Sequence, residues 1–268
     1  MSYSSEYRLL DVGGTYIKCS DGRQVPVSSD GSREVISAAL KKAVGCTDGL
    51  KGIGIAIPGP FDFREGIFRM EHKFAAVKGE SFRSLAGIPD RIPVKFHHDV
   101  NVLLRGAVRM LGLQDKNTAL VTLGTGLGFA YALHGEVQYN EWGSPARNLW
   151  NLPCGSGILE DLVSARGIRI AYARLTGNGT ESAYTIAKKA YAGDIQARQV
   201  YDRVGSLLGK AIPELMHDIP LDTVLIGGQI AKSLSLMQRP LQNALERINI
   251  VQAPENAVFE GLATLFEE

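Results

Sequence analysis

Residues 119–133 contain two apolar runs separated by a turn of glycine and threonine. The first run, Ala119–Leu123, is aliphatic and partly β-branched, and the second, Leu127–Leu133, has the same character. The pattern predicts a β-hairpin whose turn, Gly124–Thr125–Gly126, carries few side chains. Glycines lack a Cβ atom and allow positive φ angles, so the N–H groups of this turn can converge on an anion such as phosphate. Taken alone, the pattern also fits a plain turn.

The same arrangement recurs near the N-terminus. The run Arg8–Val12 includes Asp11, the small residues Gly13, Gly14 and Thr15 follow, and a second run contains Lys18. Two hairpins of one kind predict a duplicated unit. We therefore expect two related lobes that face each other across a cleft.

The composition is that of an ordinary globular enzyme. The chain has 268 residues, of which 45% are hydrophobic and 21% are charged, and its net charge of +1 gives no electrostatic case for binding nucleic acid or an anionic membrane. No apolar run approaches the roughly 18 residues of a membrane span, and residues 1–6 do not form a secretion signal, so we expect a cytoplasmic location. Three cysteines without paired spacing predict reduced, buried thiols: Cys19, Cys46 and Cys154.

The first half of the chain has the periodicity of an α/β fold. A helix is predicted from Ser32 to Val44, followed by a strand at Gly52–Ile57 that the prolines of Pro58–Gly59–Pro60 terminate. Residues 61–92 are predicted to form a hairpin and a short helix. The next strand, residues 93–97, leads into His98 and Asp99 where a helix begins. Asp99 is therefore either a ligand-binding group at the carboxyl end of a sheet or the N-cap of that helix.

The second half combines polar loops with helices. Residues 139–144 and 154–160 are predicted loops, and helical spacing covers residues 159–173, 182–192 and 195–217. A buried strand at residues 221–226 ends in Gly227 and Gly228, with a helix from about Ile230. This turn would offer N–H groups to phosphate or a nucleotide, although tight strand–helix packing explains it equally well.

The ordered set of motifs resembles the ROK family of sugar kinases and regulators, within the actin-like ATPase superfamily. The resemblance implies a two-lobed α/β fold of the ribonuclease H-like type, in which each lobe has a mixed β-sheet with helices. The implied lobes are residues 1–116 with 254–268, and residues 117–253. The motifs that carry it span nearly the whole chain: Asp11–Thr15, Pro58–Pro60, Asp99 with Asn101, Gly124–Gly128 and Gly227–Gly228.

The resemblance also implies roles for individual residues. Asp99 matches the catalytic aspartate that accepts the proton of the sugar hydroxyl during attack on the γ-phosphate of ATP. Asp11 would help to place Mg²⁺ through water. The sugar would contact Gly59, His98, Asp99, Glu141 and Glu160. The phosphates and adenosine would contact Gly13, Gly14, Thr15, Lys18, Gly124, Thr125, Gly126, Gly227 and Gly228.

Two departures from the family pattern bear on the site. Many ROK proteins hold a zinc ion with one His and three Cys, but Ser144, Leu152 and Ile158 occupy three of those positions and only Cys154 remains. A closed zinc site needs four ligands, so we predict no zinc and a loop held by packing around Trp142 and Trp150. At residue 98, where the family usually has a sugar-contacting Asn, this chain has His, which bears on the identity of the sugar.

Three functions fit these residues. The first is an ATP-dependent hexokinase of glucokinase type, acting on O6 of glucose or a related hexose or amino sugar. The second is a polyphosphate-dependent glucokinase, since such relatives also lack the zinc cysteines. The third is a non-catalytic sugar-sensing protein. Only Met1–Arg8 precede the first glycine turn, which leaves no room there for the DNA-binding segment of ROK regulators, so no nucleic-acid partner is expected. Because the family often forms dimers, a homodimer is compatible with the resemblance.

Overall fold

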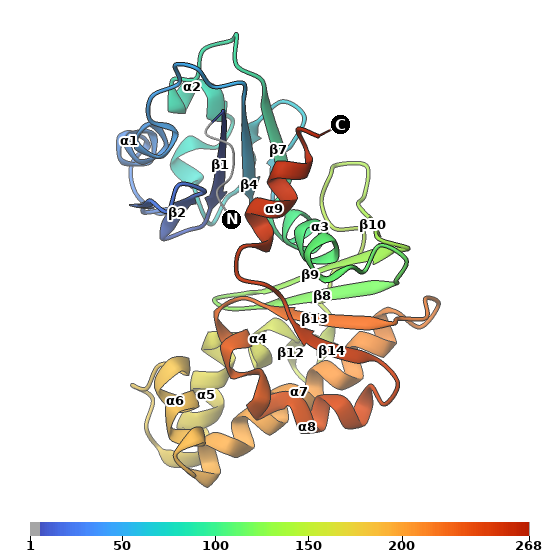
Figure 1. Ribbon diagram of the computed structural model, residues 1–268. Helices are drawn as coiled ribbons and strands as arrows, with labels where there is room; N and C mark the ends of the chain where they lie inside the picture. Colours follow the sequence, from blue (N-terminus) through green and yellow to red (C-terminus); the bar gives the residue numbers. More distant parts are fainter. Residues whose placement is uncertain (1–5, 268) are drawn as a thin grey trace. The chain divides into compact units, whose positions relative to one another are not determined.

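The computed structural model describes residues 6–267 and consists of two compact α/β units (Figure 1). The first unit runs up to Gly112 and also contains Tyr139–Pro145 and the chain from Asn256 onward. The second unit comprises Leu113–Gln138 and Ala146–Glu255. Each unit has one five-stranded mixed sheet with helices, which confirms the predicted fold class.

The two sheets have the same topology. In the first unit the strand order is β3-β2-β1-β4-β7, and in the second it is β10-β9-β8-β13-β14. In each sheet a three-stranded antiparallel meander is followed by two strands parallel to its first strand. The duplication expected from the paired glycine turns is confirmed. The strands are β1 (Tyr7–Val12), β2 (Tyr16–Cys19), β3 (Gln24–Pro26), β4 (Gly52–Ile57), β7 (Val94–His98), β8 (Thr118–Leu123), β9 (Leu127–Leu133), β10 (Glu136–Val137), β13 (Thr223–Gly227) and β14 (Asn249–Gln252).

Strand β4 shows how the first sheet accepts helices on both faces. Successive side chains of a strand point to opposite faces, and here isoleucines alternate with Gly52, Gly54 and Ala56. The isoleucines pack in a core with α1 (Arg33–Val44) and α2 (Phe82–Ala86). The small residues face α9 (Ala257–Thr264), where a methyl group on Gly54 would lie 3.2 Å from Phe266 and from Leu9. The remaining elements of this unit are β5 (Phe61–Asp62), β6 (Ile67–Phe68), η1 (Ala75–Val77) and α3 (Asp99–Leu111).

Helices α3 and α9 approach each other at glycines. A methyl group on Gly106 of α3 would lie 1.7 Å from the carbonyl oxygen of Ala257, and one on Gly261 of α9 would lie 2.0 Å from that of Val102. Real Cβ atoms do not tolerate such distances to backbone, so both positions require glycine. Helix α3 begins at Asp99, and this contact therefore fixes the helix that carries the predicted catalytic residue.

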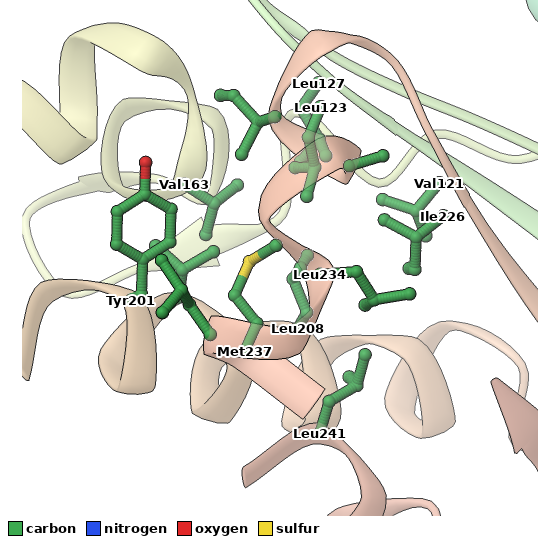
Figure 2. Close-up of a cluster of buried hydrophobic side chains, with 14 of the residues drawn as sticks. Val121, Leu123, Leu127, Val163, Tyr201, Leu208, Ile226, Leu234, Met237 and Leu241 are labelled. Atoms are coloured by element: carbon green, nitrogen blue, oxygen red, sulfur yellow. The ribbon is translucent and has the colours of Figure 1, made fainter. Parts of the chain in front are cut away.

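The core of the second unit lies between its sheet and its helices. Figure 2 shows Val121 and Ile226 from the sheet near Leu234 of the helical layer, with Met237 and Tyr201 among the other buried side chains. Burial raises the pKa of the Tyr201 hydroxyl to about 12. The helical elements are α4 (Glu160–Val163), α5 (Ala165–Thr176), α6 (Ala183–Tyr191), α7 (Ile195–Leu215), η2 (Gln229–Ser233) and α8 (Leu234–Ala244).

Two predicted helices begin differently in the structure. The predicted helix over residues 159–173 is divided at Ser164, whose backbone is extended (ψ 171°) and whose hydroxyl accepts a hydrogen bond from the Gly167 N–H. The helix expected from about Ile230 starts as the 3₁₀ segment η2, and regular α-helix begins only at Leu234. Both errors concern boundaries, which side-chain periodicity does not define. By contrast, the hairpin and short helix expected within residues 61–92 are present as β5, β6 and α2.

The segment Tyr139–Pro145 packs in the first unit, whereas the sequence-based boundaries placed it with the second lobe. The Asn101 side-chain amide donates to the carbonyl oxygen of Gly143 (3.2 Å), and a methyl group on Gly143 would lie 3.4 Å from Phe63. The remainder of the predicted lobe boundaries stays a prediction.

The loop that replaces the zinc motif is not held by tryptophans. Trp142 is 72% exposed and Trp150 is 43% exposed, so the predicted packing around them is wrong. The buried side chains are Leu149 and Leu159, and the Leu159 N–H donates to Leu152. The short hairpin of β11 (Pro153–Cys154) and β12 (Gly157–Ile158) completes the loop. Leu149 and Leu159 thus occupy the buried positions that were predicted for the two tryptophans.

Two further features concern the described residues 6–267. None of their helices is long and apolar enough to cross a membrane. Of the three cysteines, which were predicted to be buried, only Cys19 is buried, whereas Cys46 is exposed and Cys154 is intermediate.

Replacing Gly106 by alanine is expected to destabilise the first unit. The added methyl group collides with the backbone of α9, which cannot move without uncovering β4, so the free energy of unfolding falls by about 3 kcal/mol or more. Urea denaturation followed by circular dichroism measures the loss. Gly179→Ala is the matched control, because its methyl group would meet only the Ala173 side chain at 3.8 Å. Equal stability of the two variants would show that α3 and α9 do not touch at Gly106.

Purified protein is expected to contain no stoichiometric zinc. No group of three or more His, Cys, Asp or Glu side chains in the described part of the chain is arranged to hold a metal ion. Emission spectrometry of protein prepared without chelator measures the metal content. One zinc per chain, lost on Cys154→Ser, would contradict the prediction.

Candidate functional site

The first glycine turn joins β1 to β2 and exposes backbone amides. The Gly13 N–H closes the turn on the Tyr16 carbonyl oxygen (3.0 Å), and the Gly14 carbonyl oxygen accepts from the Ser29 N–H (3.1 Å). Among the described residues, no group accepts a hydrogen bond from the N–H of Gly14 or Thr15. These two amides are available to an anion at the tip of the hairpin.

The second glycine turn joins β8 to β9 in the other unit and is built similarly. The Gly124 N–H donates to the Gly126 carbonyl oxygen (3.1 Å), and the Gly124 carbonyl oxygen accepts from Ala165 at the start of α5 (2.8 Å). Within residues 6–267, the amides of Thr125 and Gly126 have no protein acceptor. Glu160 stabilises the turn, because its Oε2 accepts a hydrogen bond from the Leu127 N–H at 2.8 Å.

The glycines of these turns serve close approach rather than an unusual backbone. Gly13, Gly14, Gly124 and Gly126 do not have the positive φ angles that the sequence suggested. A methyl group on Gly13 would lie 3.0 Å from the Tyr16 carbonyl oxygen, and one on Gly126 would lie 2.9 Å from Glu160 Oε2. Absence of the Cβ atom is therefore needed at Gly13 and Gly126, whereas a methyl group on Gly124 would meet no atom within 4 Å.

Gly227 and Gly228 lie directly beside the second glycine turn. Gly228 has φ +84°, and a methyl group on it would lie 2.3 Å from the carbonyl oxygen of Leu123, the residue before Gly124. Only glycine fits this position, both for its backbone angle and for its space. The end of β13 and the turn after β8 thus form one continuous backbone surface in the second unit.

Asp11 lies at the end of β1, opposite Lys18 on β2. The Lys18 Nζ is 3.5 Å from Asp11 Oδ2. Burial raises the pKa of the Asp11 carboxyl, Lys18 opposes this rise, and the negative charge of Asp99 adds to it. A single carboxylate beside a turn with free amides is the kind of group that Mg²⁺ uses when it keeps most of its water ligands.

Asp99 is the first residue of α3, at the carboxyl end of β7. The N-cap position belongs to His98, so the reading of Asp99 as the N-cap is excluded. Asp99 Oδ1 accepts a hydrogen bond from the Val100 N–H at 2.8 Å, and its side chain is 36% exposed. The carboxylate is thus held by the start of the helix while part of it remains open to a ligand.

The surroundings of Asp99 keep it ionised. Partial burial would raise the pKa of its carboxyl, but the His98 imidazole, the Val100 N–H and the Lys73 ammonium outweigh that effect and hold the pKa below its ordinary value. The negative charge of Asp99 affects the pKa of Asp11, which precedes the first glycine turn in the same unit. Lys73 also lies near the turn, because its Cδ would be 3.8 Å from a methyl group on Gly14.

His98 links Asp99 to the loop after β4. Its Nε2 accepts a hydrogen bond from the Gly59 N–H at 3.3 Å. Its Nδ1 is buried and lies 2.8 Å from Asp99 Oδ1, without the alignment of a regular hydrogen bond. The structure therefore brings together three of the predicted sugar-site residues.

Glu141 and Glu160, the other predicted sugar ligands, belong to different units. Glu141 is exposed in the segment that Asn101 binds through Gly143. Glu160 is the first residue of α4 and shares its carboxylate with the second glycine turn. Of the two glutamates, Glu160 is the one that contacts a glycine turn.

Two residues near the site were not among the predicted site residues, although Asn101 belongs to one of the motifs that carry the family resemblance. Asn101 is buried, donates to Gly143 and leaves its Oδ1 without a partner among the described residues. Its position two residues after Asp99 was visible, but its contact with residue 143 was not. Lys73 gave no signal at all, since it lies in an irregular segment among other charged residues.

Comparisons with known proteins show which family the chain belongs to. Residues 10–264 match the model of the ROK family. The chain is 26% identical to a glucokinase from Halalkalibacterium halodurans (96% of this chain, 89% of the relative) and 25% identical to a glucokinase from Thermotoga maritima (87% and 84%).

A solved structure gives the same result for the fold. The ROK family glucokinase from Streptomyces griseus, in complex with glucose and AMPPNP, superposes with a TM-score of 0.77 at 21% identity and with coverage of 96% of this chain and 97% of that chain. The family model matches nearly the whole chain, including both glycine turns and Asp99. The chain belongs to the ROK family.

Proposed function

We propose that the protein is an ATP-dependent sugar kinase that phosphorylates a hexose hydroxyl, O6 of glucose or of a related hexose or amino sugar. The observation that carries this proposal is the placement of Asp99. An ionised and partly exposed carboxylate lies at the start of a helix, close to a turn whose free amides suit a phosphate. Phosphoryl transfer to an alcohol requires this combination of a base and an anion-binding backbone.

In the proposed reaction Asp99 accepts the proton of the sugar hydroxyl. The hydroxyl oxygen forms a bond to the γ-phosphorus, the bond from that phosphorus to the bridging oxygen breaks, and ADP leaves with the bonding electrons. The turn amides of Gly14 and Thr15 and the ammonium group of Lys73 would bind the charge of the phosphoryl group. Mg²⁺, placed near Asp11, would supply further charge neutralisation when it is bound with the phosphates.

The second unit is proposed to bind the nucleotide. The amides of Thr125 and Gly126 would bind phosphate, and Gly227 and Gly228 would contact the adenosine. Support for ATP over polyphosphate comes from the packing of Gly228 on Leu123, which places the two turns side by side. A donor without a nucleoside would have no use for that continuous backbone surface.

The sugar is proposed to contact Gly59, Glu141 and Glu160, with His98 and Asp99 beside it. Carboxylate oxygens accept hydrogen bonds from sugar hydroxyls, and the open backbone of Gly59 allows a ring to approach closely. A methyl group on Gly59 would lie 3.3 Å from His98 Nε2, so the loop is already in tight contact with the base region.

An assay of phosphate donors and sugars tests the function directly. We expect ADP release with ATP and one or a few hexoses, and a much lower rate with polyphosphate. The coupled assay uses a panel of hexoses and N-acetylhexosamines, each run first with ATP and then with polyphosphate. Turnover with polyphosphate alone would favour the second candidate function. Sugar binding by calorimetry without turnover would favour a non-catalytic sensor and would contradict the proposal.

Replacing Asp99 by asparagine is expected to abolish turnover while sugar affinity stays nearly unchanged. The amide keeps the shape and the oxygen facing the Val100 N–H but cannot accept a proton, so kcat falls by about 100-fold or more. Steady-state kinetics and calorimetric sugar binding measure the two effects. Asp48→Asn is the matched control, since the Asp48 side chain is 88% exposed and pairs only with Arg91. Activity of the Asp99 variant within about tenfold of the parent would show that another group is the base.

A further inference from the structure

Both nitrogens of the His98 imidazole face protein groups, but only Nε2 takes part in a regular hydrogen bond. Nε2 accepts from the Gly59 N–H, and Nδ1 faces the Asp99 carboxylate at 2.8 Å. The side chain is 16% exposed, and its ring lies 5.7 Å from that of Phe63. The ring therefore lies between the loop at Gly59 and the Asp99 carboxylate and offers little exposed surface to a sugar.

The hydrogen bond from Gly59 determines where the proton of His98 resides. A ring nitrogen that accepts a hydrogen bond carries a lone pair, so Nε2 is unprotonated. The proton of the neutral ring is then on Nδ1, the nitrogen beside Asp99 Oδ1. In this tautomer the N–H of Nδ1 lies beside the carboxylate, 2.8 Å from Asp99 Oδ1 but without the alignment of a regular hydrogen bond.

From these contacts we propose that His98 is a positioning residue that couples the loop at Gly59 to the orientation of Asp99. The inference rests on the proposed function, in which Gly59 borders the sugar and Asp99 is the base. Through Nδ1, His98 fixes one carboxylate oxygen toward itself and leaves the other, Oδ2, to the sugar hydroxyl. Through Nε2, it holds the Gly59 backbone at the distance that the base requires.

An asparagine at residue 98 cannot make both contacts. Its amide nitrogen lies near the place of the imidazole Nδ1, but the side chain is too short to reach Gly59. A glutamine has the complementary property, because its amide oxygen reaches about as far as Nε2 while no donor remains next to Asp99. His98→Asn therefore keeps only the contact with Asp99, and His98→Gln keeps only the contact with Gly59. The two variants separate the two contacts.

The charged groups around Asp99 are the same in both variants. Asp11 and Lys73 both interact with the Asp99 carboxylate, and Lys18 neutralises part of the charge of Asp11. None of the three is replaced in the variants, so any change follows from the contacts of residue 98.

Steady-state kinetics with ATP and the preferred sugar test the proposal. His98→Gln is expected to lower kcat by about tenfold or more with the sugar KM within about twofold, because the carboxylate loses its orientation but the loop keeps its anchor. His98→Asn is expected to raise the sugar KM by about fivefold or more with kcat within about threefold, because the loop loses its anchor. His217→Gln, on the exposed end of the second unit, is the control for loss of a histidine.

A direct sugar contact would produce a different pattern. If both variants raise KM and leave kcat alone, or if the effect on kcat/KM disappears for one deoxysugar, His98 binds the sugar and the proposal is wrong. If both variants lower kcat together with the melting temperature, the histidine only stabilises the fold and the proposal is again wrong.

Nitrogen NMR of the uniformly labelled protein tests the pairing without any substrate. Long-range proton–nitrogen correlations are expected to show His98 with Nε2 unprotonated and Nδ1 protonated. The opposite tautomer would overturn the proposal even if the protein is an active kinase. If the expected tautomer is found but no sugar is phosphorylated, the coupling of Gly59, His98 and Asp99 stands and the proposed function fails.

Discussion

The contact of α3 with α9 is the constraint on which the site of the first unit depends. Two glycines let the backbones of these helices touch, at Gly106 against Ala257 and at Gly261 against Val102. Because α3 begins at Asp99, the position of the proposed base follows from helix packing rather than from loop structure. Sites carried by regular elements hold their geometry more accurately than sites on loops. The small residues of β4 serve the same arrangement by letting α9 lie close to the sheet.

Around that fixed point, the neighbours of Asp99 hold two irregular segments. His98 accepts from Gly59 after β4, and Asn101 donates to Gly143 in the segment Tyr139–Pro145. The first turn of α3 therefore organises both the proposed base and the loops beside it. A methyl group on Gly59 would lie 3.8 Å from the Ser144 hydroxyl, which shows that the two loops are neighbours. The replacements at residues 98 and 144 relative to the family pattern thus lie together in one local environment.

Much of this arrangement was predictable because it is local in the sequence. The repeated pattern of strand, glycine turn and strand predicted two sheets of one topology, and strand ends located Asp99 and Gly228. Apart from the helix boundaries at Ser164 and Ile230, the errors have a common physical cause, which is that they depend on contacts distant in sequence. Trp142 has a large apolar side chain of the kind found in cores, but it is exposed, whereas Leu149 is buried. Likewise, the partners of Asn101 and Lys73 are set by tertiary packing, which no periodicity reveals.

The position of α9 late in the sequence has a consequence for the order in which the protein folds during synthesis. Residues 257–264 leave the ribosome after the whole of the second unit, yet they cover the Gly52, Gly54 and Ala56 face of a strand synthesised some two hundred residues earlier. During translation the nascent first unit lacks the α9 residues that pack with Leu9, Ala56 and Val102 on this face, whereas the second unit has its complete chain. We therefore expect the second unit to be the first to reach a native core, and the helix that carries Asp99 to settle last. An enzyme built this way becomes competent only when its final helix has docked.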